Sequence, residues 1–397
     1  MSLAKLMKKQ KLTVLGLNSG TSADGIDMAV LEIRRHQKKT TGRFIQGKSA
    51  AYPISLRSDI LELSDSKTTT LENVITVDQA IGTFFGQKAS SFVKYLAKKG
   101  ISVDAIASHG QTVRHIPDYP SGTKSNGTLQ LGSLEIISTL SNRVTVGDFR
   151  QADIALGNEG APITVAAMHR LFASDRESRL IVNIGGISNY FYFPSGRKGL
   201  RPLAGDCGPG NSLCDILSKK FYNKNFDKNG TIALNGKPSK RILSLLLAEP
   251  FFTKKTVSTG REAFGRELAE KLIQQGQGVG LSHADILSTA AEFTVLAITH
   301  HIKPLLKNNP SPAKLYLTGG GRKNKFFVKR LRELLKGIKV VNADELGFDA
   351  NFIEAAAYAV MGEAALRSEP LMTRFDGKNS AEYLPVLGKV VQPPVKA

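Results

Sequence analysis

The chain has 397 residues, which is enough for one large hydrophobic core or, more commonly, two. Its 54 Lys and Arg residues outnumber its 34 Asp and Glu residues, which gives a formal net charge of +20. Two cysteines are too few for a disulfide framework, and neither a signal peptide nor an apolar run of about 18 residues is present. The sequence therefore predicts a cytoplasmic protein without membrane partners.

The basic residues are scattered in short pairs, such as Lys98-Lys99 and Lys219-Lys220, with no stripe of interleaved aromatic residues. Nucleic-acid-binding surfaces typically gather positive charge on one face or in one motif, and no such motif is present. We therefore expect a solvated basic surface that attracts anionic small molecules, and no nucleic-acid partner. Duplex binding is the weaker alternative, and it would fall steeply with salt.

Strand-like and helix-like segments alternate along the chain, which predicts an α/β fold. In the first half we expect strands at Thr13–Leu17, Ile26–Ile33, Arg43–Ile54, Asp104–Ser108 and Arg143–Gly147, and helices at Leu71–Lys99 and Pro162–Phe172. In the second half we expect strands at Arg179–Ile184, Tyr190–Phe193, Lys314–Thr318 and Ile338–Val341, and helices ending near Leu305 and at Lys325–Leu335 and Asn351–Ala365. Each half has a glycine hairpin and later a strand that ends in glycine. This order predicts a duplicated domain with a ligand cleft between two lobes.

The most informative segment is the turn Ser19–Asp27, which joins the first two predicted strands. Gly20 and Gly25 lack a Cβ, so the backbone can bend there and approach a ligand closely. Hydroxyl side chains beside backbone N–H groups suit phosphate oxygens. Asp24 and Asp27 suit a bridging cation or a sugar hydroxyl instead. An ordinary β-hairpin with a glycine turn is the alternative.

Three more glycine turns occur, at Gly185-Gly186, Gly205–Asn211 and Gly319–Gly321. None has the spacing of a Walker P-loop or a dinucleotide fingerprint. Several hairpin turns that hold a nucleotide between two lobes are typical of the actin, hexokinase and sugar-kinase architecture.

The chain resembles the anhydro-N-acetylmuramic acid kinase family through motifs that cover nearly its whole length. In chain order the motifs are Ser19–Asp27, Ser108–Thr112, Asp148–Asp153, Gly160–Pro162, Asn183–Asn189, Asp206–Asn211, Asp227–Gly230, Ser258–Glu262, Gly319–Gly321, Asp344–Gly347 with Glu354-Ala355, and Leu387–Lys389. The set in this order is specific, whereas each motif alone is weak.

The resemblance implies two actin/hexokinase-like (ribonuclease H-like) lobes, at residues 1–172 and 173–397, with the C-terminal helix packed back on the first lobe. It also implies an enzyme that adds water to a 1,6-anhydro sugar and phosphorylates the freed O6 with ATP. Asp148 matches the catalytic base of the family. A carboxylate at the end of the strand Arg143–Gly147 can take a proton from the attacking water. A turn cap before Phe149 is the alternative role.

The resemblance implies ATP as a substrate and Mg²⁺ as its cofactor. It assigns the phosphates and adenosine of ATP to Gly20, Thr21, Ser22, Ala23, Asp24, Gly25, Ile26, Asp27, Gly185, Gly186, Gly208, Gly210, Gly319, Gly320 and Gly321. Glu354 and Asp206 are the carboxylates implied for Mg²⁺, which usually takes one or two from the protein. Glu354 could instead be a surface residue of a helix.

His109, Gln111 and Arg150 are the residues implied for the sugar pocket. A lone histidine is more often structural, so His109 has no assigned catalytic role. Arg150 could hold the lactyl carboxylate of an anhydromuramic sugar with two hydrogen bonds, or pair with Asp153.

The sequence departs from the usual pattern of the family at Asn18, Cys207, Arg114 and Asn158-Glu159, but Asp148 and the phosphate turn are kept. The predicted substrate is 1,6-anhydro-N-acetylmuramic acid, which belongs to the recycling of cell-wall fragments. A levoglucosan kinase, which these motifs also resemble, is the nearest alternative. A non-catalytic actin-like nucleotide-binding protein is the alternative from another class. The resemblance also implies a homodimer.

Overall fold

A meander of three antiparallel strands opens the sheet in each half of the chain, and a glycine turn joins the first two strands of each meander. The computed structural model describes residues 3–20, 22–36, 39–66, 68–116, 127–196, 201–253, 264–308, 312–373 and 384–395. The chain divides into unit 1, residues 1–171 with 351–397, and unit 2, residues 172–350.

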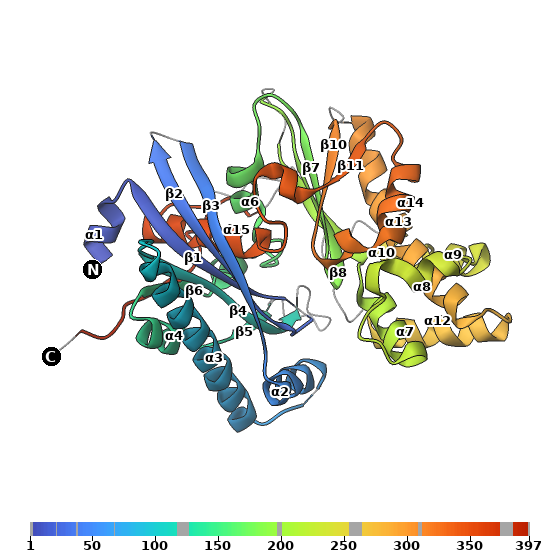
Figure 1. Ribbon diagram of the computed structural model, residues 1–397, viewed down its shortest axis with the longest axis horizontal. Helices are drawn as coiled ribbons and strands as arrows, with labels where there is room; N and C mark the ends of the chain where they lie inside the picture. The colour runs from blue at the N-terminus through green and yellow to red at the C-terminus, as the bar shows by residue number, and fades with distance from the viewer. Residues whose placement is uncertain are drawn as a thin grey trace. The chain divides into compact units, whose positions relative to one another are not determined.

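Unit 1 is built on a sheet of strand order β12-β6-β4-β1-β2-β3, with β5 also paired to β4 (Figure 1). Strand β4 runs parallel to both β1 and β6, and all other neighbours are antiparallel. Its elements are α1 (Leu3–Lys8), β1 (Lys11–Ser19), β2 (Gly25–His36), β3 (Lys39–Ala51), α2 (Ile54–Asp65), α3 (Leu71–Lys98), β4 (Ala105–Ile116), β5 (Gly127–Leu131), α4 (Leu134–Ser141), β6 (Val144–Gly147), α5 (Gln151–Ala155), α6 (Val165–Phe172), α15 (Ile353–Leu366) and β12 (Lys389–Val391).

Unit 2 is built on a sheet of strand order β11-β10-β7-β8-β9. Strand β10 runs parallel to both β7 and β11, and the pairs β7–β8 and β8–β9 are antiparallel. Its elements are β7 (Arg179–Ile184), β8 (Ile187–Phe193), β9 (Leu203–Pro209), α7 (Ser212–Tyr222), η1 (Lys228–Gly230), α8 (Thr231–Asn235), α9 (Lys240–Leu246), α10 (Pro250–Thr253), α12 (Arg266–Gly278), α13 (His283–Asn308), β10 (Lys314–Thr318), η2 (Gly320–Lys323), α14 (Lys325–Leu334), β11 (Lys339–Asn342) and η3 (Ala343–Leu346).

The two sheets repeat one topology. The order β3-β2-β1-β4-β6 of unit 1 corresponds strand for strand, and direction for direction, to β9-β8-β7-β10-β11 of unit 2. The predicted α/β class with a duplicated lobe is therefore confirmed.

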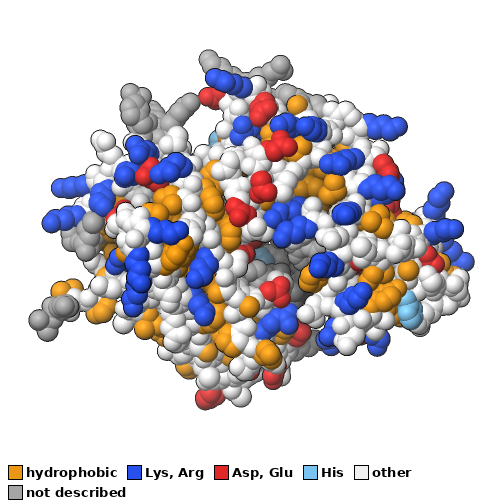
Figure 2. Space-filling view, in the orientation of Figure 1, with side chains coloured by type: hydrophobic (Ala, Val, Ile, Leu, Met, Phe, Trp, Pro, Cys, Tyr) orange, Lys and Arg blue, Asp and Glu red, His pale blue; other side chains and the backbone are white. Residues whose placement is uncertain are grey.

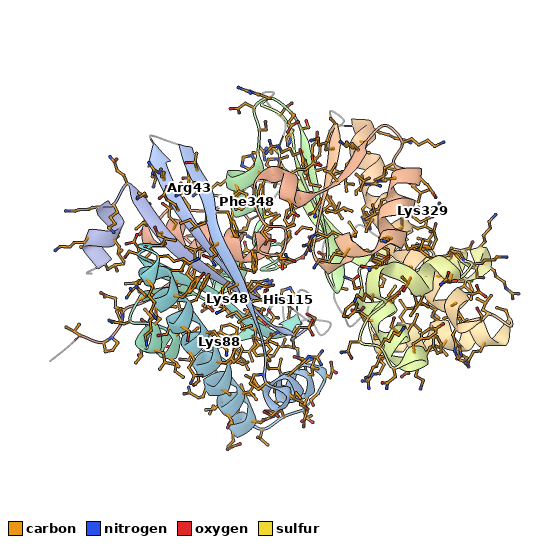
Figure 3. All side chains as sticks on the ribbon, in the orientation of Figure 1. Arg43, Lys48, Lys88, His115, Lys329 and Phe348 are labelled. Atoms are coloured by element: carbon orange, nitrogen blue, oxygen red, sulfur yellow. The ribbon has the colours of Figure 1, made fainter. Side chains whose placement is uncertain are left out.

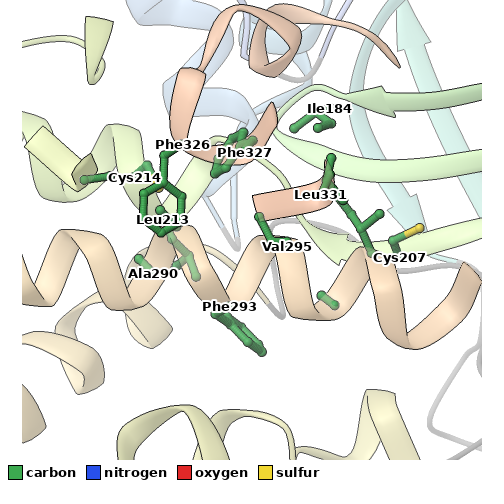
Figure 4. Packing of buried hydrophobic residues seen from close by; sticks show 14 of the residues in the cluster. Ile184, Cys207, Leu213, Cys214, Ala290, Phe293, Val295, Phe326, Phe327 and Leu331 are labelled. Carbon is green, nitrogen blue, oxygen red and sulfur yellow. The ribbon is translucent and has the colours of Figure 1, made fainter. Parts of the chain in front are cut away.

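The core of unit 2 lies where helices α7, α13 and α14 pack together and against the sheet (Figure 4). Phe293, Phe327 and Cys207 are fully buried there, and Cys214 is 2% exposed. Both cysteines are free thiols, and burial raises the pKa of each well above its usual value. They therefore act as small apolar core residues.

Unit 1 has helices on both faces of its sheet. Successive side chains of β1 point to opposite faces, so they contact different helices. Leu15 and Leu17 belong to the cluster that includes α3. Gly16 faces α15, and a Cβ built there would lie 1.8 Å from the Ala355 carbonyl oxygen and 2.8 Å from the Ala359 amide nitrogen. Helix α15 can therefore touch β1 backbone to backbone only because Gly16 has no side chain.

Three predicted boundaries are wrong for local reasons. Strand β3 ends at Ala51, because Pro53 starts helix α2. Strand β4 continues to Ile116 instead of ending near Ser108, because Gly110 adopts a φ of +75° and lets the strand bend without stopping. Helix α6 begins at Val165, beyond the cis-proline at position 162.

We expect Gly16→Ala to lower the free energy of unfolding by about 1–3 kcal/mol or more, because the added methyl group overlaps the backbone of α15. Urea unfolding of the purified protein measures the change. The matched control is Gly278→Ala at the end of α12, where a Cβ has nothing within 4 Å. A Gly16→Ala protein as stable as this control would contradict the close contact.

Candidate active site

The candidate catalytic residue, Asp148, directly follows β6, a strand that is buried along its whole length. Its backbone φ of +56° is a left-handed conformation, which aspartate tolerates better than most residues. The next residue, Phe149, is buried, and its ring centroid lies 5.8 Å from that of Tyr358 on α15. Asp148 keeps 24% of its side chain exposed, and its Oδ2 lies 2.5 Å from Lys389 Nζ on β12. The buried Phe149 side chain thus anchors the turn, while the Asp148 carboxylate beside it stays partly accessible to solvent.

The guanidinium of Arg150 is fixed by the residues around it. Its Nε donates to His109 Nε2 at 3.2 Å, and its Nη1 donates to the Gly160 carbonyl oxygen at 2.8 Å. The His109 ring stacks on Tyr358 with centroids 4.7 Å apart. Burial and then the Arg150 charge lower the pKa of His109 well below its usual value, so the ring is neutral. The same two causes lower the pKa of His115, further along β4, to about 4 (Figure 3).

Asp153 also binds Gly160, which lies in the loop after α5. Its Oδ2 accepts the Gly160 amide at 2.8 Å, and its Oδ1 accepts from Asn158 Nδ2 at 2.8 Å and from Thr373 Oγ1. Arg150 and Asp153 therefore bind the carbonyl and the amide of Gly160, and no ion pair between the two is found among the described contacts. The Asp153 carboxylate and the Arg150 guanidinium therefore both fix the loop after α5 through Gly160.

The hairpin between β1 and β2 is closed from inside by a buried polar network. Ser19 Oγ lies 2.7 Å from the Gly25 carbonyl oxygen and 2.6 Å from Gln111 Oε1, and it accepts from the Tyr52 hydroxyl at 3.0 Å. Gln111 Nε2 donates to the Gly20 carbonyl oxygen at 3.3 Å. Gln111 is 1% exposed and braces the hairpin, so its place in a sugar pocket stays a prediction.

The outer side of the hairpin is held by α2. Arg57 donates to the Ala23 carbonyl oxygen and to Asp24 Oδ1, both at 3.1 Å. At Gly25 a Cβ would lie 2.2 Å from the Ala50 carbonyl oxygen, so glycine is required there by packing. At Gly20, by contrast, a Cβ would have nothing nearer than 3.9 Å. The hairpin is therefore open at Gly20, where a ligand could approach the backbone.

The remaining residues of this hairpin differ in exposure. Ile26 is buried in the core of unit 1, so only its backbone can face a ligand. Ser22 is partly exposed. Thr21 and the motif Ser258–Glu262 lie outside the described residues.

A pair of carboxylates lies where α15 meets β1 and β2. Asn18 and Asp27 face each other across the β1–β2 pair, and Asn18 Nδ2 donates to Glu354 Oε2 at 3.0 Å. Ser49 Oγ donates to Asp27 Oδ1 at 2.6 Å. The Glu354 side chain is accessible to solvent, yet the protein around it and then the Asp27 charge raise the pKa of its carboxyl group. Two carboxylates that repel each other in this way are a suitable site for a divalent cation.

The glycine turns of unit 2 come together around the end of β7. Asn211 donates its amide to the Gly185 carbonyl oxygen at 2.7 Å, and Gly210 donates its amide to that of Gly186 at 2.8 Å. A Cβ at Gly319 would lie 2.6 Å from the Ile184 carbonyl oxygen, and one at Gly210 would lie 2.2 Å from that of Gly185. A Cβ at Gly321 would meet the Ile184 side chain at 2.3 Å. These glycines are thus required by the packing of three turns on one another. Gly320 and Gly185 are exceptions, since a Cβ there would have nothing nearer than 3.7 Å and 3.4 Å, respectively.

Asp206 and Gly208 lie on β9, beside this group of turns. Asp206 pairs with Asn189 of β8, and its charge adds to the burial that raises the pKa of Tyr190. Gly208 has a φ of +110°, which favours glycine. Glu354 belongs to unit 1 and Asp206 to unit 2, and no three acidic, histidine or cysteine side chains within the described ranges form a metal cluster.

Several residues of this site were not predicted. Tyr358, Asn18, Tyr52 and Arg57 contact predicted site residues, but they are single apolar or polar side chains without a pattern in the sequence. Lys389 was part of a predicted motif without a role.

The part of the chain that the structure describes has no helix long and apolar enough to cross a membrane. Its Lys and Arg side chains are spread over the visible face (Figure 2).

The repeated sheets with glycine turns at their strand ends define a duplicated α/β protein of the actin and hexokinase type. Sequence comparison narrows the class, since residues 12–391 match the family described as anhydro-N-acetylmuramic acid kinase. The chain belongs to this family, which is a kinase family, and ATP is the implied phosphoryl donor.

Relatives of the same description cover most of the chain. The protein of Caldanaerobacter subterraneus subsp. tengcongensis is 30% identical over 98% of this chain and 99% of its own length. The protein of Trichormus variabilis is 37% identical over 88% and 89%, respectively. Among solved structures, a xylulose kinase from Lactobacillus acidophilus is similar with 10% identity and a TM-score of 0.42, over 96% of this chain and 94% of that one. A similarity this distant supports no conclusion on function.

We expect Glu354→Gln to raise the free energy of unfolding at pH 7.5 when no divalent cation is present. The pKa of Glu354 in the folded state lies above its ordinary value of 4.5, so the folded state binds this proton more tightly than the unfolded state. The ionised carboxylate therefore destabilises the fold above that pH, and the effect of the substitution should vanish toward pH 4.

Urea unfolding in EDTA at the two pH values measures this difference. Glu62→Gln, at an exposed carboxylate of α2 without an ion pair among the described residues, is the control for loss of charge. Equal or lower stability of Glu354→Gln at pH 7.5 would contradict the expected strain.

Proposed function

We propose that the chain is an ATP-dependent kinase that hydrolyses the 1,6-anhydro bridge of 1,6-anhydro-N-acetylmuramic acid and phosphorylates O6. The products are N-acetylmuramic acid 6-phosphate and ADP, and the reaction serves the recycling of cell-wall fragments. The observation that carries this proposal is the accessible Asp148 carboxylate, held in a left-handed turn at the end of β6 within a chain of this family.

In the proposed reaction Asp148 is the general base. Its carboxylate takes a proton from the water molecule whose oxygen bonds to the anomeric carbon. The bond between that carbon and O6 breaks, and O6 attacks the γ-phosphorus of ATP, from which ADP departs. Proton, water and phosphoryl group are thereby all accounted for, and Asp148 is regenerated when the proton passes to solvent.

In this reaction Glu354 would hold Mg²⁺, with Asp27 as a neighbouring carboxylate, and Asp206 would contribute through a water molecule. A cation near Glu354 and Asp27 would offset the repulsion that raises the pKa of Glu354. When bound, Mg²⁺ neutralises charge on the transferred phosphoryl group.

We assign the ATP phosphates to the hairpin at Gly20 and to the turns at Gly186 and Gly210, and the adenosine to Gly319–Gly321. Backbone amides in glycine turns suit phosphate oxygens. Gly20 supports this assignment, because its surroundings leave room for a ligand beside the backbone. Gly25, Gly210 and Gly319 act by letting the turns pack closely.

The proposal places the sugar near Asp148, with Arg150 as the cation for its lactyl carboxylate. Arg150 Nη1 donates to Gly160, and both Nε and Nη2 lie within hydrogen-bond distance of His109 Nε2, so the orientation of the guanidinium is fixed. His109 is neutral and buried, so it supports Arg150 instead of exchanging protons with substrate.

A cytoplasmic location and a homodimer remain part of the proposal, and light scattering of the purified protein tests the dimer.

The decisive experiment is turnover of ATP with a panel of sugars. We expect ADP and a sugar 6-phosphate from 1,6-anhydro-N-acetylmuramic acid, and none from N-acetylmuramic acid or glucose, because only the anhydro bridge releases O6 in the reaction. Mass spectrometry of the products measures both. A preference for levoglucosan would change the assigned substrate but not the assigned reaction. A folded protein that phosphorylates no anhydro sugar would refute the proposal.

We expect Asp148→Asn to lower kcat by about 10²–10⁴-fold or more, because an amide cannot accept the proton of the attacking water. ATP binding, measured by calorimetry, should be unchanged. Asp59→Asn on the exposed face of α2 is the matched control. Turnover of Asp148→Asn near that of the control would remove Asp148 from the role of base.

A further inference from the structure

The C-terminal strand β12 brings a cation to the candidate base. It pairs antiparallel with β6, with Lys389 opposite Gly147, Val390 opposite Val146 and Val391 opposite Thr145. Gly147 directly precedes Asp148 in the chain. A residue about 240 positions later in the sequence is thus placed beside Asp148 by the register of one short strand pair.

The residues before Lys389 fit this position closely. Leu387 is 1% exposed, so it anchors the strand in unit 1. Gly388 has a φ of +96°, and a Cβ there would lie 3.0 Å from both the Phe149 ring and Val146 Cγ1. A larger residue at position 388 would push β12 away from β6. The motif Leu387–Lys389 is therefore shaped to lie against the turn that carries Asp148.

Lys389 meets the Asp148 carboxylate directly. Its Nζ lies 2.5 Å from Asp148 Oδ2. The hydrogen bond and the charge of Asp148 raise the pKa of Lys389, and the more distant charge of Glu135 on α4 adds to this effect. Among the described residues Lys389 is the ion-pair partner of Asp148, so its ammonium group is placed to hold one oxygen of this carboxylate.

We propose that Lys389 is a positioning residue that holds the Asp148 carboxylate in one orientation and balances its charge until the proton of the attacking water arrives. This inference rests on the proposed function, because it assigns Lys389 a role in the same proton transfer. One oxygen of the carboxylate is engaged by Lys389, which leaves the other for the water. Transfer of the proton neutralises Asp148, and its loss to solvent restores the ion pair.

The exposure of Lys389 separates this role from a role in folding. The side chain is 73% exposed, and an exposed ion pair contributes little to stability. We therefore expect Lys389→Met to fold normally, and its effect to fall on the rate.

The test is a double-mutant cycle on kcat with wild type, Lys389→Met, Asp148→Asn and the double variant. We expect Lys389→Met to lower kcat about 10–100-fold, as loss of a supporting partner commonly does, with the KM for ATP unchanged. Lys389→Arg should restore most of the rate. In the Asp148→Asn background the loss of Lys389 should have no further effect, because Lys389 acts only through Asp148.

Lys94→Met on α3 is the control for loss of one exposed positive charge. The inference is overturned if Lys389→Met turns over like this control, or if the two substitutions lower kcat multiplicatively, since Lys389 would then act independently of Asp148. Wild-type protein that phosphorylates no anhydro sugar would instead refute the proposed function, and the positioning role with it. The first two results leave the proposed function intact, so the two failures can be told apart.

Discussion

The contact between α15 and β1 at Gly16 is the constraint on which the candidate site of unit 1 depends. The carbonyl oxygen of Ala355 occupies the space that any side chain at position 16 would need. This close approach sets the neighbours of α15, because Glu354 then meets Asn18 and Tyr358 stacks on His109. A helix held further from the sheet would separate the carboxylate pair and remove the aromatic support of the Asp148 turn.

The backbone at Asp148 is positioned mainly by the residues that follow it in the chain. Phe149 is buried against Tyr358 and beside Gly388, while Arg150 is fixed through Gly160 and His109. The residues on the C-terminal side of the carboxylate are therefore immobilised by four different segments. Rigid support of this kind lets a left-handed backbone conformation persist at a single, partly exposed residue.

The sequence predicted the local features well and the long-range ones poorly. Strands such as β7 and β10 were predicted to the residue, because a buried strand between turns leaves a clear apolar pattern. The partner of Gly16 lies about 340 positions away, and nothing in either segment specifies the other. Some motifs of the family proved structural, since Asp227 accepts the amides of Ile232 and Ala233 at the start of α8. A motif marks a constrained position, and only contacts distinguish chemistry from packing.

The division of the chain also has a consequence for its synthesis. Unit 2 is a continuous stretch, residues 172–350, inserted into unit 1, which needs residues 351–397 for its completion. Because domains tend to fold as units while the chain emerges from the ribosome, unit 2 can form before unit 1 is whole. Helix α15 and strand β12 leave the ribosome after unit 2, and they carry Glu354 and Lys389. A nascent chain that has not yet reached this segment would contain Asp148 yet lack two of the charged groups around it, so the candidate site of unit 1 cannot be complete until unit 2 has been synthesised.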